Sequence, residues 1–404
     1  MIPYGKQLIS DDDIEAVVSV LKSDFLTQGP IVPLFEQTFS KKVGSKYAVA
    51  TNSATSSLHL ACLVLGVGPG KLVWTSPISF VASSNCALYC GAEIDFVDID
   101  SNTYNLSVDS LEAKLKIARK QNRLPDVVIP VHLSGQSCDM KSIHKLSLEY
   151  GFKIIEDASH AVGAKYNSSY VGSCEFSDIC VFSFHPVKII TSGEGGMATT
   201  NDINFAIKMN SLRSHGITRD PDSMKEKPHG SWFYQQNELG FNYRLTDISA
   251  SLGLSQLNSL DSFIAKRHKI ADRYFQELDI ENLLLPFQSD NGRSSFHLFI
   301  IRATALIGPM SHKNLFERLR TSGINVNLHY IPIYKHPYYK EIGFSEPHYP
   351  EAELYYSEAI SIPIFPSMTY EEQTKVINTI KEINLEQKTE GSKIKYKDGF
   401  QDLF

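Results

Sequence analysis

Short runs of apolar and β-branched residues alternate with helix-like stretches over the first 200 positions of the chain. The runs are residues 71–75, 93–97, 127–131, 153–155 and 179–183. Alternation of this kind is typical of βα units and predicts a mostly parallel sheet with helices on both faces. Because the carboxyl ends of parallel strands share one crevice where ligands bind, functional residues are expected at these strand ends.

The pattern changes at about residue 255. A long helical segment around residues 266–269 is followed by a strand-like run at 296–301 and an amphipathic helix near 371–383. We therefore predict an N-terminal arm and a large α/β domain at 1–255, and a smaller α+β domain at 256–387. The last residues, 388–404, contain few apolar side chains and are predicted to form a polar tail.

A helix is predicted within the N-terminal arm. Ser10 is a suitable N-cap, Asp11 to Asp13 favour the positive end of a helix, and apolar residues recur with helical spacing from Ile14 to Leu21. The segment Thr27–Pro30 then ends this pattern.

The composition argues against nucleic acid or a membrane as a partner. Hydrophobic residues make up 42% of the 404 positions, enough for a sizeable core, and the net charge at pH 7 is only -6. Without a basic cluster the chain has no surface that would follow a phosphate backbone. No apolar run reaches the length of a membrane span and the N-terminal residues lack the features of a signal peptide, so we expect a cytoplasmic protein.

The cysteines suggest neither a metal site nor a disulfide framework. They form no C-x-x-C pair, and most have apolar neighbours in the sequence, so we expect reduced residues that serve packing. The six are Cys62, Cys86, Cys90, Cys138, Cys174 and Cys180.

The strongest local motif begins at the apolar run 179–183. Ser183 ends this run, a turn containing Pro186 leads to Lys188, and the glycine-rich segment 192–196 follows. Glycines let the backbone reverse tightly, and partial burial lowers the pKa of a lysine so that its neutral amine can attack an aldehyde. Lys188 is therefore a candidate for a lysine that forms a Schiff base.

A carboxylate at another strand end complements this lysine. The run 153–155 continues to Asp157 and then His160. Pyridoxal 5'-phosphate (PLP) is an aldehyde cofactor that withdraws electrons only while its pyridine nitrogen is protonated, and a neighbouring carboxylate keeps it so. Asp157 fits this role. Glu156 and Asp178 are alternative carboxylates, although side-chain alternation lets only one of two neighbours face the crevice.

Small hydroxylic residues open a helix after an earlier strand. In the segment Thr51–Leu58, free amides at the helix start favour a phosphate, and small side chains let it approach. Ser183 is a further donor for this phosphate. Phe80 follows another strand and is a candidate for stacking on the cofactor ring.

Together these segments resemble the DegT/StrS family of sugar-nucleotide aminotransferases, PLP enzymes with the aspartate-aminotransferase fold (fold type I). The similarity extends over nearly the whole chain. The segments 130–136 and 329–332 are most similar to the members that act in pseudaminic acid synthesis. The most distinctive stretches are residues 26–30, 52–56, 155–161, 183–188 with the glycine turn, 213–216 and 240–247.

The resemblance implies roles for the residues around the cofactor. Lys188 holds PLP covalently, and Asp157 pairs with the ring nitrogen. Phe80 and His160 contact the ring. The phosphate is held by Ala54, Thr55 and Ser183.

Three further residues are implied only by the resemblance. Asn242 matches a residue that reaches the phosphate from the neighbouring subunit, which implies a homodimer with shared active sites. Thr27 and His329 match parts of the sugar-nucleotide pocket. One position departs from many relatives, because Ser159 stands where they have alanine.

The reaction implied by the resemblance moves an amino group from L-glutamate to C4 of a UDP-linked 4-keto-6-deoxy-N-acetylhexosamine. Another UDP- or dTDP-linked ketosugar is an alternative substrate. The cation that binds the carboxylate of glutamate is left open among Arg213, Arg219 and Arg244. A sugar dehydratase that uses pyridoxamine phosphate is disfavoured because such relatives have histidine in place of Lys188, and no DNA-binding helix pair supports a PLP-binding regulator.

Overall fold

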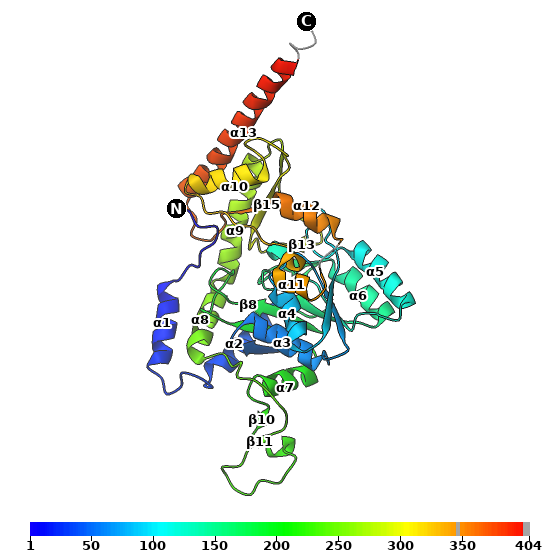
Figure 1. Ribbon diagram of the computed structural model, residues 1–404. Coiled ribbons are helices and arrows are strands. Elements are labelled where there is room, and N and C mark those ends of the chain that lie inside the picture. The colour runs from blue at the N-terminus through cyan, green and yellow to red at the C-terminus, as the bar shows by residue number, and fades with distance from the viewer. Residues whose placement is uncertain (345–347, 399–404) are drawn as a thin grey trace.

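A mixed sheet forms the centre of the computed structural model, which describes residues 1–344 and 348–398 (Figure 1). Among these residues the large sheet has seven strands in the order β1-β9-β8-β5-β4-β2-β3. Its pairs are parallel except the two that β9 makes with β1 and β8, so the prediction of a mostly parallel sheet is confirmed. The strands are β1 (Tyr47–Thr51), β2 (Leu72–Thr75), β3 (Glu93–Phe96), β4 (Val127–Ile129), β5 (Lys153–Asp157), β8 (Ile179–Ser183) and β9 (Gly196–Thr200).

Helices cover both faces of this sheet, and side-chain alternation along each strand decides which layer a residue meets. On β5, Ile155 packs into the core beneath α3, α4 and α7, whereas Ile154 packs beneath α5 and α6. Because side chains on a strand alternate with a period of two, Asp157 shares the face of Ile155 and Glu156 lies on the opposite face. These helices are α3 (Ala54–Val64), α4 (Ala82–Tyr89), α5 (Val108–Lys120), α6 (Met140–Tyr150) and α7 (Ile203–Leu212).

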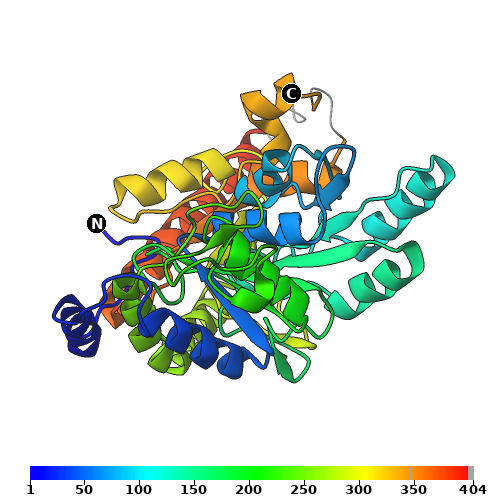
Figure 2. The same cartoon turned by 90° about the horizontal axis from the view of Figure 1, so that it is seen from below.

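The second face of β8 and β9 is covered by α2 (Ile31–Val43), α8 (Asp247–Asn258) and α9 (Leu260–Glu277). Seen from below, α5 and α6 in cyan lie across the molecule from α1 (Asp11–Leu21) and α2 in dark blue (Figure 2). Helix α1 begins as predicted, because the Ser10 hydroxyl accepts the Asp13 amide and the Asp13 carboxylate accepts the Ser10 amide. None of the helices in the described residues is both long and apolar enough to span a bilayer.

A smaller antiparallel sheet follows in the C-terminal part of the chain, in the order β12 (Leu283–Leu284), β14 (Phe299–Ala303) and β15 (Ala359–Ile362). The strand predicted at 296–301 begins later, at Phe299, because Ser295 and Leu298 donate their amides to the turn at Gly135 and Ser134 instead. The first residues of the chain also pack here: the amide of Ile2 donates to Gly323 at 2.8 Å. The extreme N-terminus thus lies beside residues more than 300 positions away.

The helix predicted near 371–383 is α13, Tyr370–Asp398, which projects from the body of the molecule (Figure 1). It continues through the first part of the segment predicted as a polar tail, since glutamate, lysine and glutamine favour a helix and no proline interrupts it. Residues 399–404 of that segment lie outside the described residues.

The remaining elements are short. Strands β10 and β11 pair in a segment that extends away from the large sheet (Figure 1). These elements are β6 (Lys165–Tyr166), β7 (Ser169–Tyr170), β10 (Ile217–Thr218), β11 (Gln235–Gln236), β13 (Gly292–Arg293), α10 (His312–Thr321), α11 (Pro337–Glu341), α12 (Pro350–Glu358) and the 3-10 turns Leu133–Gly135, Pro221–Ser223 and Ile333–Lys335.

Candidate active site

The carboxyl ends of β1, β2, β5 and β8 lie beside a cavity of about 790 Å³. Its other wall is formed by Tyr4 of the N-terminal segment, by His297, which precedes β14, and by residues 327–330, of which Asn327 bridges to Ser361 of β15. The predicted site residues Thr27 and Asn242 do not line it. The predicted site residues that do are Ala54, Thr55, Phe80, Asp157, His160, Ser183, Lys188 and His329.

One end of the cavity is suited to a phosphate. Ser53 caps α3 by accepting the amide of Ser56 at 3.1 Å, which leaves the amides of Ala54 and Thr55 without a partner among the described residues. Gly196 allows β9 to approach this helix start, because a Cβ there would lie 2.5 Å from the Ala54 nitrogen. Unpaired amides at the positive end of a helix form an anion site.

Lys188 reaches the cavity from the turn after β8. Its amide donates to the His185 carbonyl at 2.9 Å, which closes this turn. Burial lowers the pKa of Lys188 from 10.5 to about 8, although the charge of Asp157 opposes this shift. About a fifth of the amine is therefore neutral and nucleophilic at about pH 7.4, against about a thousandth for an ordinary lysine.

Asp157 is the carboxylate that β5 directs into the cavity, and its side chain is buried. Its two rivals point elsewhere. Glu156 lies on the opposite face of β5 and accepts from His132 at 2.7 Å. Asp178 precedes β8, at the other end of that strand, and pairs with Lys153 at 2.9 Å. The alternation along β5 therefore leaves Asp157 as the carboxylate opposite Lys188.

Three histidines gather on the other side of Lys188. The ring centroids of His160 and His297 are 4.4 Å apart, and His160 Nε2 is 2.9 Å from the Tyr330 hydroxyl. Burial and the nearby charge of Lys188 lower the pKa of His329 to about 3. Burial also lowers the pKa values of His160 and His297 well below the ordinary value. This wall consequently presents neutral imidazoles and a phenol.

The sequence patterns did not identify several of the residues that line the cavity. Tyr4, His297 and Asn327 carry no local motif and come together only because the N-terminal segment and the smaller sheet meet over the crevice. Ser83 does not line the cavity but donates to Asp157, and it lies in the serine-rich segment 76–84, three residues after Phe80. A search for hydroxyl donors near the strand end could have identified it.

Thr27 and Asn242 lie on the surface, outside the cavity. Thr27 is exposed and forms a single bridge with Thr246, and Asn242 is exposed and bridges to Ser214. Asn242 is nevertheless close to the phosphate end, because its carbonyl is 3.5 Å from the side-chain nitrogen of Asn52.

The three candidate arginines also lie outside the lining of the cavity in the described residues. Arg213 is held by Glu36 and by the Ala50 carbonyl. Arg244 donates to a serine hydroxyl at 3.1 Å, and Arg219 lies on the projecting β10–β11 segment. The described residues therefore favour no choice among the three.

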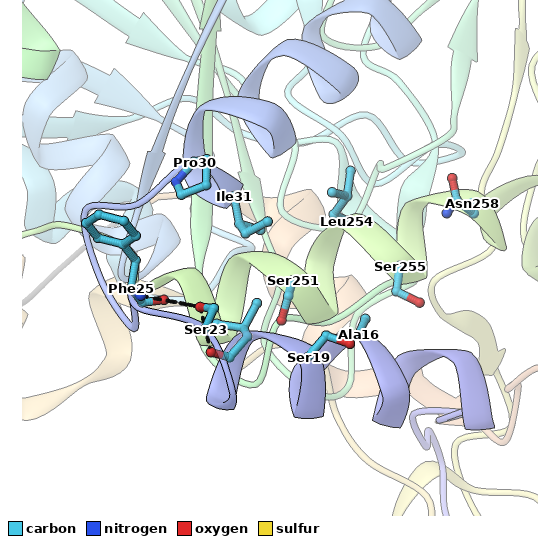
Figure 3. A pocket seen from close by; sticks show the side chains of 11 residues that line it. Ala16, Ser19, Ser23, Phe25, Pro30, Ile31, Ser251, Leu254, Ser255 and Asn258 are labelled. Carbon is cyan, nitrogen blue, oxygen red and sulfur yellow. Dashed lines mark hydrogen bonds between the residues drawn. The ribbon is translucent and has the colours of Figure 1, made fainter.

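A second hollow, of about 460 Å³, lies between α1 and α8 (Figure 3). The described residues that line it are apolar side chains such as Phe25, Ile31 and Leu254, together with several serines and one asparagine. They include no acid, base or lysine, so we do not regard this hollow as a catalytic site. Across the described residues, no three side chains of His, Cys, Asp or Glu are grouped so that they could hold a metal ion.

Comparison with known proteins identifies the family to which this chain belongs. Residues 7–381 match the model of the DegT/DnrJ/EryC1/StrS aminotransferase family. The chain belongs to this family. It is 37% identical over 387 residues to the spore coat polysaccharide biosynthesis protein SpsC of Bacillus subtilis, covering 95% of this chain and 97% of that protein. It is 36% identical over 384 residues to the UDP-4-amino-4,6-dideoxy-N-acetyl-beta-L-altrosamine transaminase of Campylobacter jejuni, covering 94% and 96%.

Solved structures confirm the aminotransferase fold. Helicobacter pylori PseC, an aminotransferase involved in pseudaminic acid biosynthesis, superposes with a TM-score of 0.86 at 30% identity, covering 95% of this chain and 99% of PseC. The PLP form of Spr1654 from Streptococcus pneumoniae superposes with a TM-score of 0.84 at 29% identity, covering 95% and 98%. The protein is therefore a PLP-dependent sugar aminotransferase of the DegT/DnrJ/EryC1/StrS family.

The residues of the cavity fit PLP. The unpaired amides at the start of α3 suit its phosphate, and Gly196 leaves the space that a Cβ would fill. The amine of Lys188, with its lowered pKa, suits the aldehyde, and the carboxylate of Asp157 suits the ring nitrogen.

Proposed function

We propose that this aminotransferase moves the amino group of L-glutamate to C4 of a UDP-linked 4-keto-6-deoxy-N-acetylhexosamine. The observation that carries this proposal is the cavity in which Lys188 and Asp157 face a wall of neutral polar groups. The similarity to the Campylobacter transaminase and to PseC, over more than nine-tenths of the chain, supports the sugar.

PLP, when bound, supplies the aldehyde and the electron-withdrawing ring that aminotransferases use. We propose that the residues of the chain bind and orient it as follows. The amides of Ala54 and Thr55 and the Ser183 hydroxyl hold the phosphate. Asp157 accepts a hydrogen bond from the protonated ring nitrogen and so keeps it protonated. The neutral amine of Lys188 takes the proton from the amino donor's α-carbon and passes it to the cofactor.

Ring contacts are assigned to Phe80 and His160. Phe80 is exposed at the cavity although it is apolar, which favours a role in stacking. His160 is held by the Tyr330 hydroxyl at 2.9 Å and stays neutral, because burial and Lys188 lower its pKa. A neutral imidazole can lie over a pyridinium ring without electrostatic repulsion.

The wall opposite the phosphate site is assigned to the sugar. His329 is fixed by the Ser361 hydroxyl at 2.8 Å, and Asn327 lies 3.3 Å from its other ring nitrogen. Tyr4 packs against His329 with ring centroids 5.2 Å apart. Neutral donors and acceptors of this kind suit the hydroxyl and acetamido groups of an uncharged sugar ring.

A homodimer with shared sites is the assembly we propose. Exposed apolar side chains surround the surface residues Thr27 and Asn242: Phe25 is 53% exposed, Leu26 47%, and Leu239 81%. Burial of such side chains against a second subunit would bring Thr27 and Asn242 towards the partner's cavity.

Subunit complementation tests this assembly. Lys188→Ala and Asn242→Glu are each expected to inactivate, the second because a carboxylate repels the phosphate. Unfolding and refolding an equal mixture should restore about a quarter of the wild-type activity, since half of the dimers are mixed and each contains one intact site. A mixture as inactive as its components would show that the sites are not shared.

The substrate is tested by incubating the purified protein with glutamate and a panel of UDP- and dTDP-linked ketosugars, with products identified by mass and NMR. We expect the UDP-linked 4-keto-6-deoxy-N-acetylhexosamine to give its 4-amino derivative, and Lys188→Ala to give none. Borohydride should attach a pyridoxyl group to Lys188 in the wild type only.

The similarity to SpsC, which is as strong as that to the transaminases, favours a second candidate. This is transfer to a different nucleotide-linked ketosugar by the same residues. Preferred turnover of another member of the panel would establish it and contradict the first substrate.

We also propose a cytoplasmic location. All six cysteines lie in the described residues, and each has a free thiol. Free, mostly buried thiols are typical of a reducing compartment. Recovery of the protein from a membrane or secreted fraction would contradict this.

A further inference from the structure

The carboxylate of Asp157 accepts three hydrogen bonds from two serines. The Ser83 hydroxyl donates to Oδ2 at 2.6 Å, and the Ser159 hydroxyl donates to Oδ1 at 2.6 Å. The amide of Ser159 also donates to Oδ1, at 3.1 Å. Ser83 lies on α4 and Ser159 follows β5, so the carboxylate is held from two separate elements.

The Ser83 hydroxyl donates to the carboxylate oxygen at 2.6 Å, a shorter contact than the 3.3 Å to the Phe80 carbonyl, and this fixes the direction of the neighbouring Ser79 bond. Ser83 Oγ lies 2.6 Å from Ser79 Oγ, and both serines are buried. Because a hydroxyl has one proton, Ser83 must receive from Ser79 when it donates to Asp157. Chains of this kind strengthen each bond along their length.

These donors leave one acceptor position on Asp157. The two oxygens of a carboxylate offer about four lone-pair positions, and the described residues fill three of them. Asp157 also lines the cavity. The unfilled position is therefore available to an N–H donor within the cavity.

We propose that Ser83 and Ser159 are positioning residues that fix the carboxylate of Asp157 so that its remaining acceptor meets the ring N–H of PLP. The inference rests on the pairing of Asp157 with that nitrogen, as proposed above. The Ser159 hydroxyl adds a second restraint on Oδ1 to the one that the Ser159 amide provides. Without the two hydroxyls the carboxylate can rotate away from the ring.

Two measurements at fixed pH test this. One is the dissociation constant of PLP from the purified apoprotein, followed by fluorescence. The other is the ¹⁵N NMR shift of bound PLP labelled at the ring nitrogen. Ser159→Ala and Ser83→Ala should each weaken binding about tenfold, as expected for a lost hydrogen bond to a charged group, and should move the shift towards that of unprotonated pyridine. Ser159→Thr should restore both values.

Ser177→Ala is the matched control. It removes a hydroxyl that donates to Glu156 on the opposite face of β5, so both measurements should equal those of the wild type. Ser159 is only partly buried and its amide bond survives in alanine, so this variant is expected to fold even if Ser83→Ala does not.

The outcomes distinguish the positioning role of the two serines from the proposed pairing of Asp157 with the ring nitrogen. If Asp157→Asn changes the ¹⁵N shift but Ser159→Ala changes neither measurement, the serines do not position the carboxylate. If Asp157→Asn leaves the shift unchanged, the pairing of Asp157 with the ring nitrogen is itself wrong, and the inference is overturned with it. A shift that Ser177→Ala moves as much as Ser159→Ala would also overturn it.

Discussion

Replacement of Lys188 by methionine is expected to stabilise the cofactor-free protein near neutral pH. Burial lowers the pKa of Lys188 from 10.5 to about 8, against the opposing charge of Asp157. Each pKa unit corresponds to about 1.4 kcal/mol. The ammonium form of this side chain therefore costs the folded state about 3 kcal/mol, which methionine, of similar length and without charge, avoids.

The pH dependence identifies the cause of this gain. Because the folded state binds the proton of Lys188 more weakly than the unfolded state does, the wild type gains stability as pH rises from about 8 to about 10.5. The penalty is complete below the folded pKa and absent above the unfolded one. The advantage of Lys188→Met should thus be about 3 kcal/mol at about pH 7 and should fall to the packing difference of the two side chains by about pH 10.5.

Urea unfolding of the apoprotein at both pH values, at one protein concentration, measures this difference. Lys266→Met is the control, since Lys266 is exposed on α9, and it should change the free energy of unfolding by less than about 0.5 kcal/mol. A Lys188→Met variant no more stable than the wild type near pH 7, or equally stabilised at both pH values, would refute the reasoning.

Four further substitutions have defined outcomes. Asp157→Asn should lower kcat at least about hundredfold without unfolding the protein, whereas Glu156→Gln, which weakens a buried pair with a histidine, should lower the free energy of unfolding instead; kcat and urea midpoints distinguish them. Gly135→Ala should cost more than about 2 kcal/mol, because its φ is +99° and its Cβ would lie 2.2 Å from a serine hydroxyl. Arg267→Met should cost about 3 kcal/mol, since Arg267 donates to three buried carbonyls; thermal or urea unfolding checks both.

The local patterns of the sequence were sufficient for the cofactor side of the cavity. The period of two along β5 separates Asp157 from Glu156, and the turn after β8 delivers Lys188 within five residues of Ser183. These features depend on strand geometry and on short-range backbone turns, which neighbouring residues largely determine. The helix start at Ala54 could be predicted for the same reason.

The substrate side could not be predicted in this way. Tyr4, His297 and Asn327 come together because the N-terminal segment pairs with residues 323–325 and 364, next to the smaller sheet and more than 300 residues away along the chain. The periodicity of a sequence reflects only contacts within one helix or strand and its immediate neighbours. It therefore does not predict contacts between segments that are far apart in the chain. The ordinary-looking His297 becomes part of the cavity wall only through its position beside His160.

The sequence by itself therefore determined the mostly parallel sheet, the strand ends, and the lysine and candidate carboxylates near them, because these follow from local periodicity and short motifs. The choice of Asp157 over Glu156 and Asp178 came from the structure. Tertiary structure alone decided the lowered pKa of Lys188, the neutral histidines and the serines around Asp157. Each of these is a property of burial and of contacts between distant segments, and desolvation acts on a side chain only when the fold removes it from water.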